Sequence, residues 1–187
     1  RTTFFVMLPA SVGLIVLALP IVSTLFGGGR FDINSARLTA NALFFYSIGL
    51  FAYGATKILQ SCFFALKDTV TPTKVAAIAL IINVILNSIL MFPLKIGGLA
   101  LATSLSGIST FFILFVLLRK RLDNFKVKDI ILSFIRILLA SLCMGAVCFY
   151  VSKNVFLGEN ILDKIINLGL SVICAILAYI IFCFIFR

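Results

Sequence analysis

The chain has 187 residues, of which 63% are hydrophobic and 12% charged, and its formal net charge is +10. A soluble domain of this length cannot bury so much apolar surface, so the composition indicates an integral membrane protein. The sequence has no histidine and only six carboxylates, which makes a hydrolase or metalloenzyme site hard to build. We therefore predict that the protein is not an enzyme.

The sequence contains six apolar runs, each long enough to cross a bilayer as a helix of about 20 residues. Their approximate bounds are Phe4–Phe26, Leu38–Leu66, Thr73–Phe92, Gly97–Leu118, Ile130–Ser152 and Ile165–Phe186. The runs are continuous rather than alternating, which argues against a transmembrane barrel. We predict an all-α fold, a polytopic membrane helix bundle with six transmembrane helices.

The first two runs contain several residues that shape membrane helices. Pro20 lies deep inside the first run, where a missing backbone hydrogen bond should kink the helix. Asn34 or Ser35 is a plausible cap for the second helix. Gly49 and Gly54 in the second run permit close contact with another helix. The chain begins with arginine rather than methionine, and we read it as a piece of a longer protein.

Polar residues interrupt the second, third and fourth runs, where lipid would not tolerate them. Lys57 either snorkels to the interface along its own stem or lines a water-filled cavity and meets an anionic group. Asn83 and Asn87 are four residues apart and therefore share one helical face. They either bond to a neighbouring helix or, with Thr103 and backbone carbonyls, form an oxygen cage for a small cation such as sodium. The small residues at 100–110 predict a helix-packing face.

The basic residues lie mostly in short loops between the runs, where membrane topology accounts for them without nucleic acid. Five cysteines lie in apolar runs without metal-ligand spacing, which suits small buried hydrophobic residues. One side of the membrane would carry nine basic residues, namely Arg1, Lys67, Lys74, Arg119, Lys120, Arg121, Lys126, Lys128 and Arg187. The other would carry five, namely Arg30, Arg37, Lys95, Lys153 and Lys164. The positive-inside rule then predicts that both ends are cytoplasmic.

Several segments together resemble the MurJ/MviN family of lipid II flippases, within the multidrug/oligosaccharidyl-lipid/polysaccharide exporter superfamily. The segments are PASVGL at 9–14, GRF at 29–31, YSIGL at 46–50, FFALKDT at 63–69 with Thr71 and Pro72, and GGLALATS at 97–104. The resemblance extends from about Phe4 to Leu118 and continues more weakly, by helix count and spacing, to the end.

This resemblance implies a fourteen-helix transporter with two six-helix lobes and a final helix pair. The chain would supply helices nine to fourteen: residues 1–121 the last four helices of the second lobe, and residues 122–187 the two additional helices. Its location would be the bacterial cytoplasmic (inner) membrane. The N-terminal lobe of the same protein, membrane lipids and lipid II would be its partners.

The implied function is translocation of lipid II, the lipid-linked peptidoglycan precursor, from the cytoplasmic to the outer leaflet by alternating access. Lys57 and Arg30 would contribute to substrate binding. The resemblance also implies a possible sodium site that uses Asn83, Asn87, the Leu99 carbonyl and Thr103, with no other cofactor. The alternatives are a related exporter of polysaccharide-linked lipid or drugs, a membrane enzyme, and a non-transporting membrane scaffold.

Overall fold

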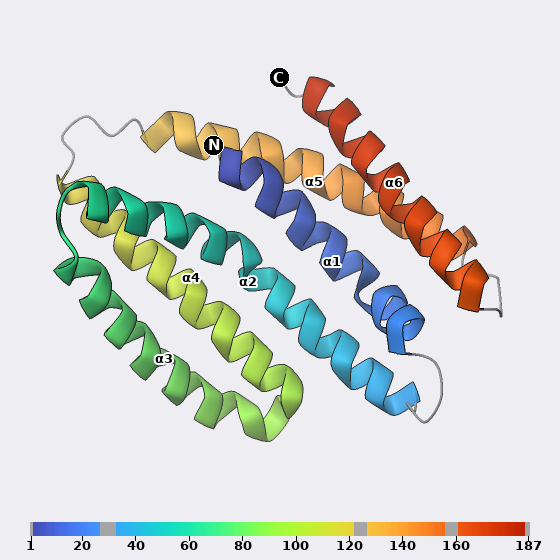
Figure 1. Ribbon diagram of the computed structural model, residues 1–187, viewed down its shortest axis with the longest axis horizontal. Helices are drawn as coiled ribbons and strands as arrows, with labels where there is room; N and C mark the ends of the chain where they lie inside the picture. The colour runs from blue at the N-terminus through green and yellow to red at the C-terminus, as the bar shows by residue number, and fades with distance from the viewer. Residues whose placement is uncertain (1, 27–32, 122–126, 156–160, 186–187) are drawn as a thin grey trace.

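The computed structural model describes residues 2–26, 33–121, 127–155 and 161–185, and within these ranges the chain forms six helices (Figure 1). They are α1 (Thr2–Phe26), α2 (Ile33–Ala65), α3 (Val70–Leu94), α4 (Ile96–Arg121), α5 (Val127–Val155) and α6 (Ile161–Ile185). Each helix is long and apolar enough to cross a membrane. The prediction of an all-α membrane helix bundle is therefore confirmed.

The helices form two groups of three that meet along α1 and α2 (Figure 1). In one group, α4 packs against both α2 and α3. In the other, α1 packs against α5, and α6 packs against α5 and more lightly against α1. Successive helices run in opposite directions, so the start of α3 lies at the same end of the bundle as the ends of α2 and α4.

Small residues allow α4 to lie close to both of its neighbours, as the sequence predicted. The buried positions of its first half are Gly97, Gly98, Ala100, Ala102, Ser104, Ser106 and Gly107. A Cβ atom on Gly49 of α2 would lie 2.7 Å from the Cα of Ser104, so the two backbones are in direct contact there. The Ser104 hydroxyl donates a 2.6 Å hydrogen bond to the Phe45 carbonyl, which joins α4 to α2 at the same place.

An aromatic cluster connects the two groups of helices. Phe4 of α1 and Phe134 of α5 have ring centroids 5.3 Å apart. Phe51 of α2 lies 6.0 Å from Phe134 and 6.5 Å from Phe111 of α4, measured between centroids. Edge-to-face and tilted pairs of this kind stabilise contacts beyond the apolar area that they bury. The cluster therefore helps to hold α5 beside the group that contains α2 and α4.

The turn between α2 and α3 is tied to the end of α4. Lys67 has φ 57°, and the amides of Lys67 and Asp68 donate to the carbonyls of Phe64 and Phe63, which is a Schellman ending for α2. The Asp68 carboxylate then accepts from the Thr71 amide at 2.9 Å and the Thr71 hydroxyl at 2.6 Å, and so caps α3. Arg121 at the end of α4 pairs with this carboxylate at 2.7 Å.

Several helix bounds differ from the sequence prediction. Because α2 begins at Ile33, the prediction that Asn34 or Ser35 precedes and caps it is wrong; both residues lie within its first turn. α3 begins at Val70, so Pro72 lies in its first turn. Backbone amides there have no hydrogen-bond acceptor within the helix, so a proline breaks no helical hydrogen bond. α1 continues past Pro20 to Phe26, and its last turns change direction in Figure 1, as the predicted kink requires.

Candidate functional site

Lys57 lies on the outward face of α2, about two turns before the helix ends at Ala65. Its side chain is exposed, and no carboxylate pairs with it in the described part of the chain. Tyr53 and Ser61, one turn to either side, are exposed on the same face. The helix therefore presents the Lys57 ammonium group on a face that its neighbours within this chain leave partly uncovered.

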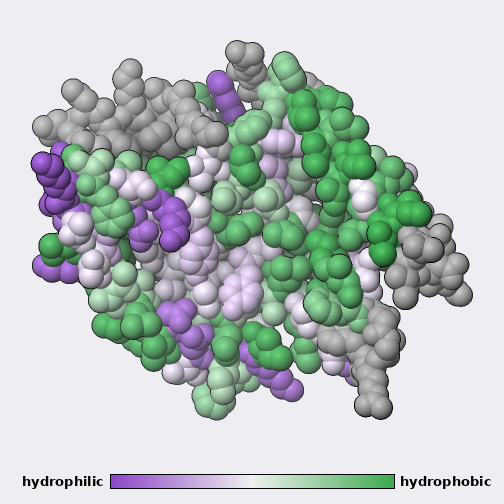
Figure 2. Space-filling model, viewed as in Figure 1, coloured by the Kyte–Doolittle hydropathy of each residue, from purple (hydrophilic) through white to green (hydrophobic). Residues whose placement is uncertain are grey.

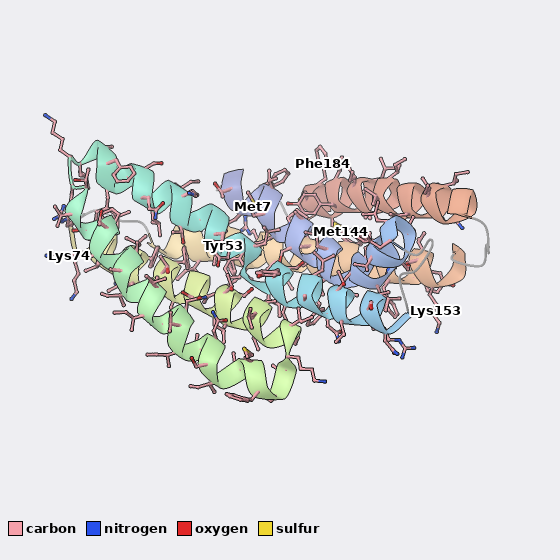
Figure 3. All side chains as sticks on the ribbon, turned by 60° about the horizontal axis from the view of Figure 1, so that its bottom comes forward. Met7, Tyr53, Lys74, Met144, Lys153 and Phe184 are labelled. Carbon is pink, nitrogen blue, oxygen red and sulfur yellow. The ribbon has the colours of Figure 1, made fainter. Side chains whose placement is uncertain are left out.

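Tyr53 connects this face of α2 to α4. Its hydroxyl donates a 2.8 Å hydrogen bond to the main-chain carbonyl of Thr103. Its ring lies against Gly107, where a Cβ atom would come within 2.8 Å of the Tyr53 Cζ atom. Figure 3 shows Tyr53 between the two ends of the bundle, which are marked by Lys74 and Lys153. Sequence reasoning missed this residue, although a tyrosine one turn before Lys57 in an apolar run was a signal for it.

Asn83 and Asn87 contact each other on α3. The Asn87 side-chain Nδ2 donates a 2.9 Å hydrogen bond to Asn83 Oδ1. The other amide atom of Asn87, Oδ1, is buried and has no hydrogen-bond partner among the described residues. A buried acceptor without a partner loses its solvation without compensation. The pair therefore leaves one amide oxygen, Asn87 Oδ1, available for a donor or a cation.

The antiparallel contact of α3 and α4 shows how far along the bundle axis Leu99 and Thr103 of α4 lie relative to the two asparagines of α3. Ser106 donates a 2.8 Å hydrogen bond to the Ala79 carbonyl, and Gly98 lies against the Leu90 backbone. Counting one turn at a time from these two contacts places Asn83 near the height of Thr103 and Asn87 near the height of Leu99.

Thr103 and Leu99 are already bonded to each other, since the Thr103 hydroxyl donates to the Leu99 carbonyl at 2.8 Å. The structure thus gathers these two residues on one turn of α4, at the level of the asparagine pair.

The chemistry of these groups fits a small hard cation. Amide, hydroxyl and carbonyl oxygens are ligands for ions of this type, and the Thr103 hydroxyl, which donates its hydrogen to the Leu99 carbonyl, keeps its oxygen lone pairs. Among the described residues there is no cluster of histidine, cysteine, aspartate or glutamate that could hold a transition metal. The orphaned Asn87 Oδ1 is the observation that favours a cation over a purely structural contact.

The more hydrophilic residues on the surface are also found over α2 and α4. In Figure 2, pale and purple residues extend over the middle of α2 and α4, and hydrophobic residues lie on both sides of them. The remaining predicted site residue, Arg30, lies outside the described residues.

The chain is similar to known proteins along most of its length. Residues 1–166 match the family model described as lipid II flippase MurJ. The lipid II flippase MurJ of Thermosipho africanus is 33% identical over 189 residues, which cover 100% of this chain and 36% of that protein. The probable lipid II flippase MurJ of Haemophilus influenzae is 34% identical over 151 residues, which cover 80% of this chain and 29% of that protein.

A solved structure has the same arrangement of helices. It is described as lipid II flippase MurJ in the inward closed conformation, and the chain matches it with a TM-score of 0.79 and 31% sequence identity. The match covers 98% of this chain and 36% of that structure. The chain therefore spans about a third of the length of the relatives that it matches.

Proposed function

The chain belongs to the lipid II flippase MurJ family, and we propose on that premise that the full-length protein carries lipid II across the bacterial cytoplasmic membrane. Lipid II, a lipid-linked peptidoglycan precursor, would move from the cytoplasmic to the outer leaflet. The protein would expose one binding site alternately to each side as its lobes rock against each other. The match of 98% of this chain to about a third of a solved lipid II flippase MurJ supports this assignment.

Within this transporter, the chain would supply helices nine to fourteen. We assign α1 to α4 to the second lobe and α5 and α6 to the additional pair. The contact of α1 with both α2 and α5 would then join the lobe to the pair.

Lys57 is the residue that we propose for binding the pyrophosphate of lipid II. It lies far enough from either end of α2 to be within the membrane, and its exposed ammonium group has no carboxylate partner among the described residues. A desolvated cation in this position is costly unless it meets water or an anion. A cavity that admits a pyrophosphate would supply both, and Arg30 is proposed as a second cation for the same substrate.

Asn83, Asn87, the Leu99 carbonyl and Thr103 are proposed to hold a sodium ion. A bound cation would supply positive charge and fix the spacing of α3 and α4 at that level. The hydrogen bond from Tyr53 to Thr103 would place the cation site one turn of α2 away from Lys57.

The orientation proposed for the chain places both of its ends on the cytoplasmic side. Lys67, Lys74, Arg119, Lys120 and Arg121 lie at the end of the bundle where α1, α3 and α5 begin, in agreement with the positive-inside rule.

Translocation of lipid II by the full-length protein in liposomes tests the proposed function. Lys57→Gln should lose most of the activity, because a hydrogen bond to a charged group contributes about 1.5–3 kcal/mol, or roughly ten- to hundredfold in binding. Lys57→Arg should keep part of the activity. Lys153→Gln is the matched control, because Lys153 is an exposed lysine at the end of the bundle opposite to Lys74. This variant should transport normally. No lipid II translocation by the unmodified protein would refute the function, and normal transport by Lys57→Gln would refute only the role of Lys57.

A further inference from the structure

We propose that four basic residues at one end of the bundle form a binding site for the headgroups of anionic phospholipids. The residues of this basic patch are Lys67, Lys74, Arg119 and Lys120. The site is separate from the proposed substrate site, since Lys57 precedes Lys67 by ten residues, about 15 Å along a helix. The proposal holds whether or not the protein transports lipid II.

The basic patch is drawn together by contacts between three helices. Lys67 is the left-handed residue that ends α2, and it directly precedes Asp68. Asp68 pairs with Arg121, which brings the last turn of α4, with Arg119 and Lys120, to the turn between α2 and α3. Lys74 follows one turn after Thr71, whose amide and hydroxyl both bond to Asp68. Figure 3 shows Lys74 at this end of the molecule.

Among the residues whose side chains the structure describes, none neutralises the charge of the patch. Asp68 is the only carboxylate among the residues whose side chains the structure describes, and Arg121 occupies it. Arg121 also lies over the Phe63 ring, with its guanidinium carbon 5.9 Å from the ring centroid. Its charge is therefore engaged in contacts within the protein. The four remaining cations are exposed and have no carboxylate partner within the described ranges.

The apolar neighbours of the patch indicate that its ligand is a membrane lipid rather than a soluble anion. Phe64, Leu66 and Val70 are 53%, 46% and 58% exposed and lie beside Lys67 and Asp68 in sequence. The helical segments that are long and apolar enough to cross a membrane end at Ala65 and Arg121 and begin again at Val70. Cations at the end of a span with exposed apolar residues beside them match a phospholipid, which offers a phosphate above an acyl chain.

The test uses the purified full-length protein in detergent, titrated with phosphatidylglycerol or with phosphatidylcholine of the same acyl chains. Thermal unfolding gives the lipid concentration that half-saturates the shift, and native mass spectrometry counts bound lipids. We expect phosphatidylglycerol to bind more tightly than phosphatidylcholine. A basic residue near an anionic surface contributes roughly fivefold in affinity, so the triple variant Lys74→Gln/Arg119→Gln/Lys120→Gln should bind on the order of 100-fold more weakly.

Two matched variants make the result specific to this end of the bundle. Arg37→Gln/Lys95→Gln/Lys153→Gln removes the same charge from exposed residues elsewhere and should bind phosphatidylglycerol normally. Lys74→Arg/Arg119→Lys/Lys120→Arg keeps the charge and should also bind normally, which separates loss of binding from loss of folding. Equal binding of the two lipids, or equal losses in the two neutralised triples, would overturn the proposal. So would inorganic phosphate reproducing the effect of phosphatidylglycerol at the same ionic strength, since the ligand would then be a soluble anion.

Discussion

The hydroxyl of Tyr53 on α2 donates a 2.8 Å hydrogen bond to the main-chain carbonyl of Thr103 on α4. The turn of α2 that precedes Lys57 is therefore bonded to the turn of α4 that carries the Thr103 hydroxyl. One of these turns is proposed to bind an anionic substrate and the other a cation. A shift of α4 against α2 would have to break this hydrogen bond, so Tyr53 would hold the two proposed binding turns at a fixed distance from each other.

Removing the Tyr53 hydroxyl should destabilise the protein slightly. In Tyr53→Phe the ring still packs against Gly107, and only the hydrogen bond to Thr103 is lost. Hydrogen bonds between membrane helices contribute about 0.6 kcal/mol on average, so we expect a loss of stability of about 0.5–1 kcal/mol in thermal unfolding of the full-length protein. If the hydroxyl also positions the site, lipid II translocation should fall by more than this loss of stability accounts for.

Tyr46→Phe is the matched control for this variant. Tyr46 lies two turns earlier on α2 and is exposed, and no hydrogen bond from its hydroxyl is present within the described residues. We expect its stability and its transport to match those of the native protein. Equal effects of the two substitutions would show that the bond to Thr103 has no special role.

Gly49 should be among the least replaceable residues of the chain. A Cβ atom there would lie 2.7 Å from the Cα of Ser104, and main chain cannot move aside as the end of a flexible side chain can. We expect Gly49→Ala to cost about 1–3 kcal/mol, the usual range for overpacking. In Gly169→Ala the added methyl group meets nothing within 4 Å, so this variant should be neutral or more stable by up to about 1 kcal/mol. Thermal unfolding measures the stability of both variants. A Gly49→Ala variant as stable as the native protein would contradict the close contact of α2 and α4.

Asp68 should make stability depend on pH in the acid range. Its hydrogen bonds from Thr71, and then the nearby Arg121, lower the pKa of the carboxyl group from its ordinary value. A lowered folded-state pKa means that the stabilisation is complete well above the ordinary value of about 3.9 and is lost as the pH falls through the lowered value. Asp68→Asn should therefore be less stable than the native protein at pH 7, and the difference should shrink towards pH 3. Melting temperatures that differ equally at both pH values would contradict this origin.

The sequence was sufficient to predict the helices because each apolar run is continuous and long. The main misjudged boundary was the start of α2, where polar residues such as Asn34 and Ser35 suggested a cap outside the helix. Exposed polar residues are compatible with the first turn of a helix, so hydropathy alone could not find that boundary. The packing role of Gly49 was predicted, because a small residue in a membrane span has few other uses.

The relationships between side chains on different helices were harder to predict. The spacing of Asn83 and Asn87 was enough to place them on one face, and they do bond to each other. The bond of Tyr53 to Thr103 depends on how far α2 and α4 slide along each other, and apolar periodicity does not determine that offset. The same is true of Arg121 and Asp68, whose pairing requires the end of α4 to reach a turn that is 53 residues away in sequence.

Replacing Asn87 with aspartate should distinguish a cation site from a structural contact. The buried Oδ1 of Asn87 lacks a partner among the described residues, and Asp places a charged oxygen at the same position. A sodium ion there would gain a stronger ligand and stabilise the folded state by mass action, by about 2.7 kcal/mol at a concentration of one hundred times its Kd. Without a cation, the new charge would be partly buried without compensation and would only destabilise the protein.

The measurement is thermal unfolding of the purified full-length protein in sodium and in potassium at equal ionic strength. We expect sodium to raise the melting temperature of the Asn87→Asp variant more than that of the native protein, and potassium to raise neither to the same extent. Ser88→Asp is the control, because Ser88 is the adjacent, exposed residue and its new carboxylate would face away from the asparagine pair. Sodium should not selectively stabilise that variant. If neither the native protein nor Asn87→Asp distinguishes sodium from potassium, and Asn87→Asp is simply less stable, Asn83 and Asn87 serve to pack α3 and bind no ion.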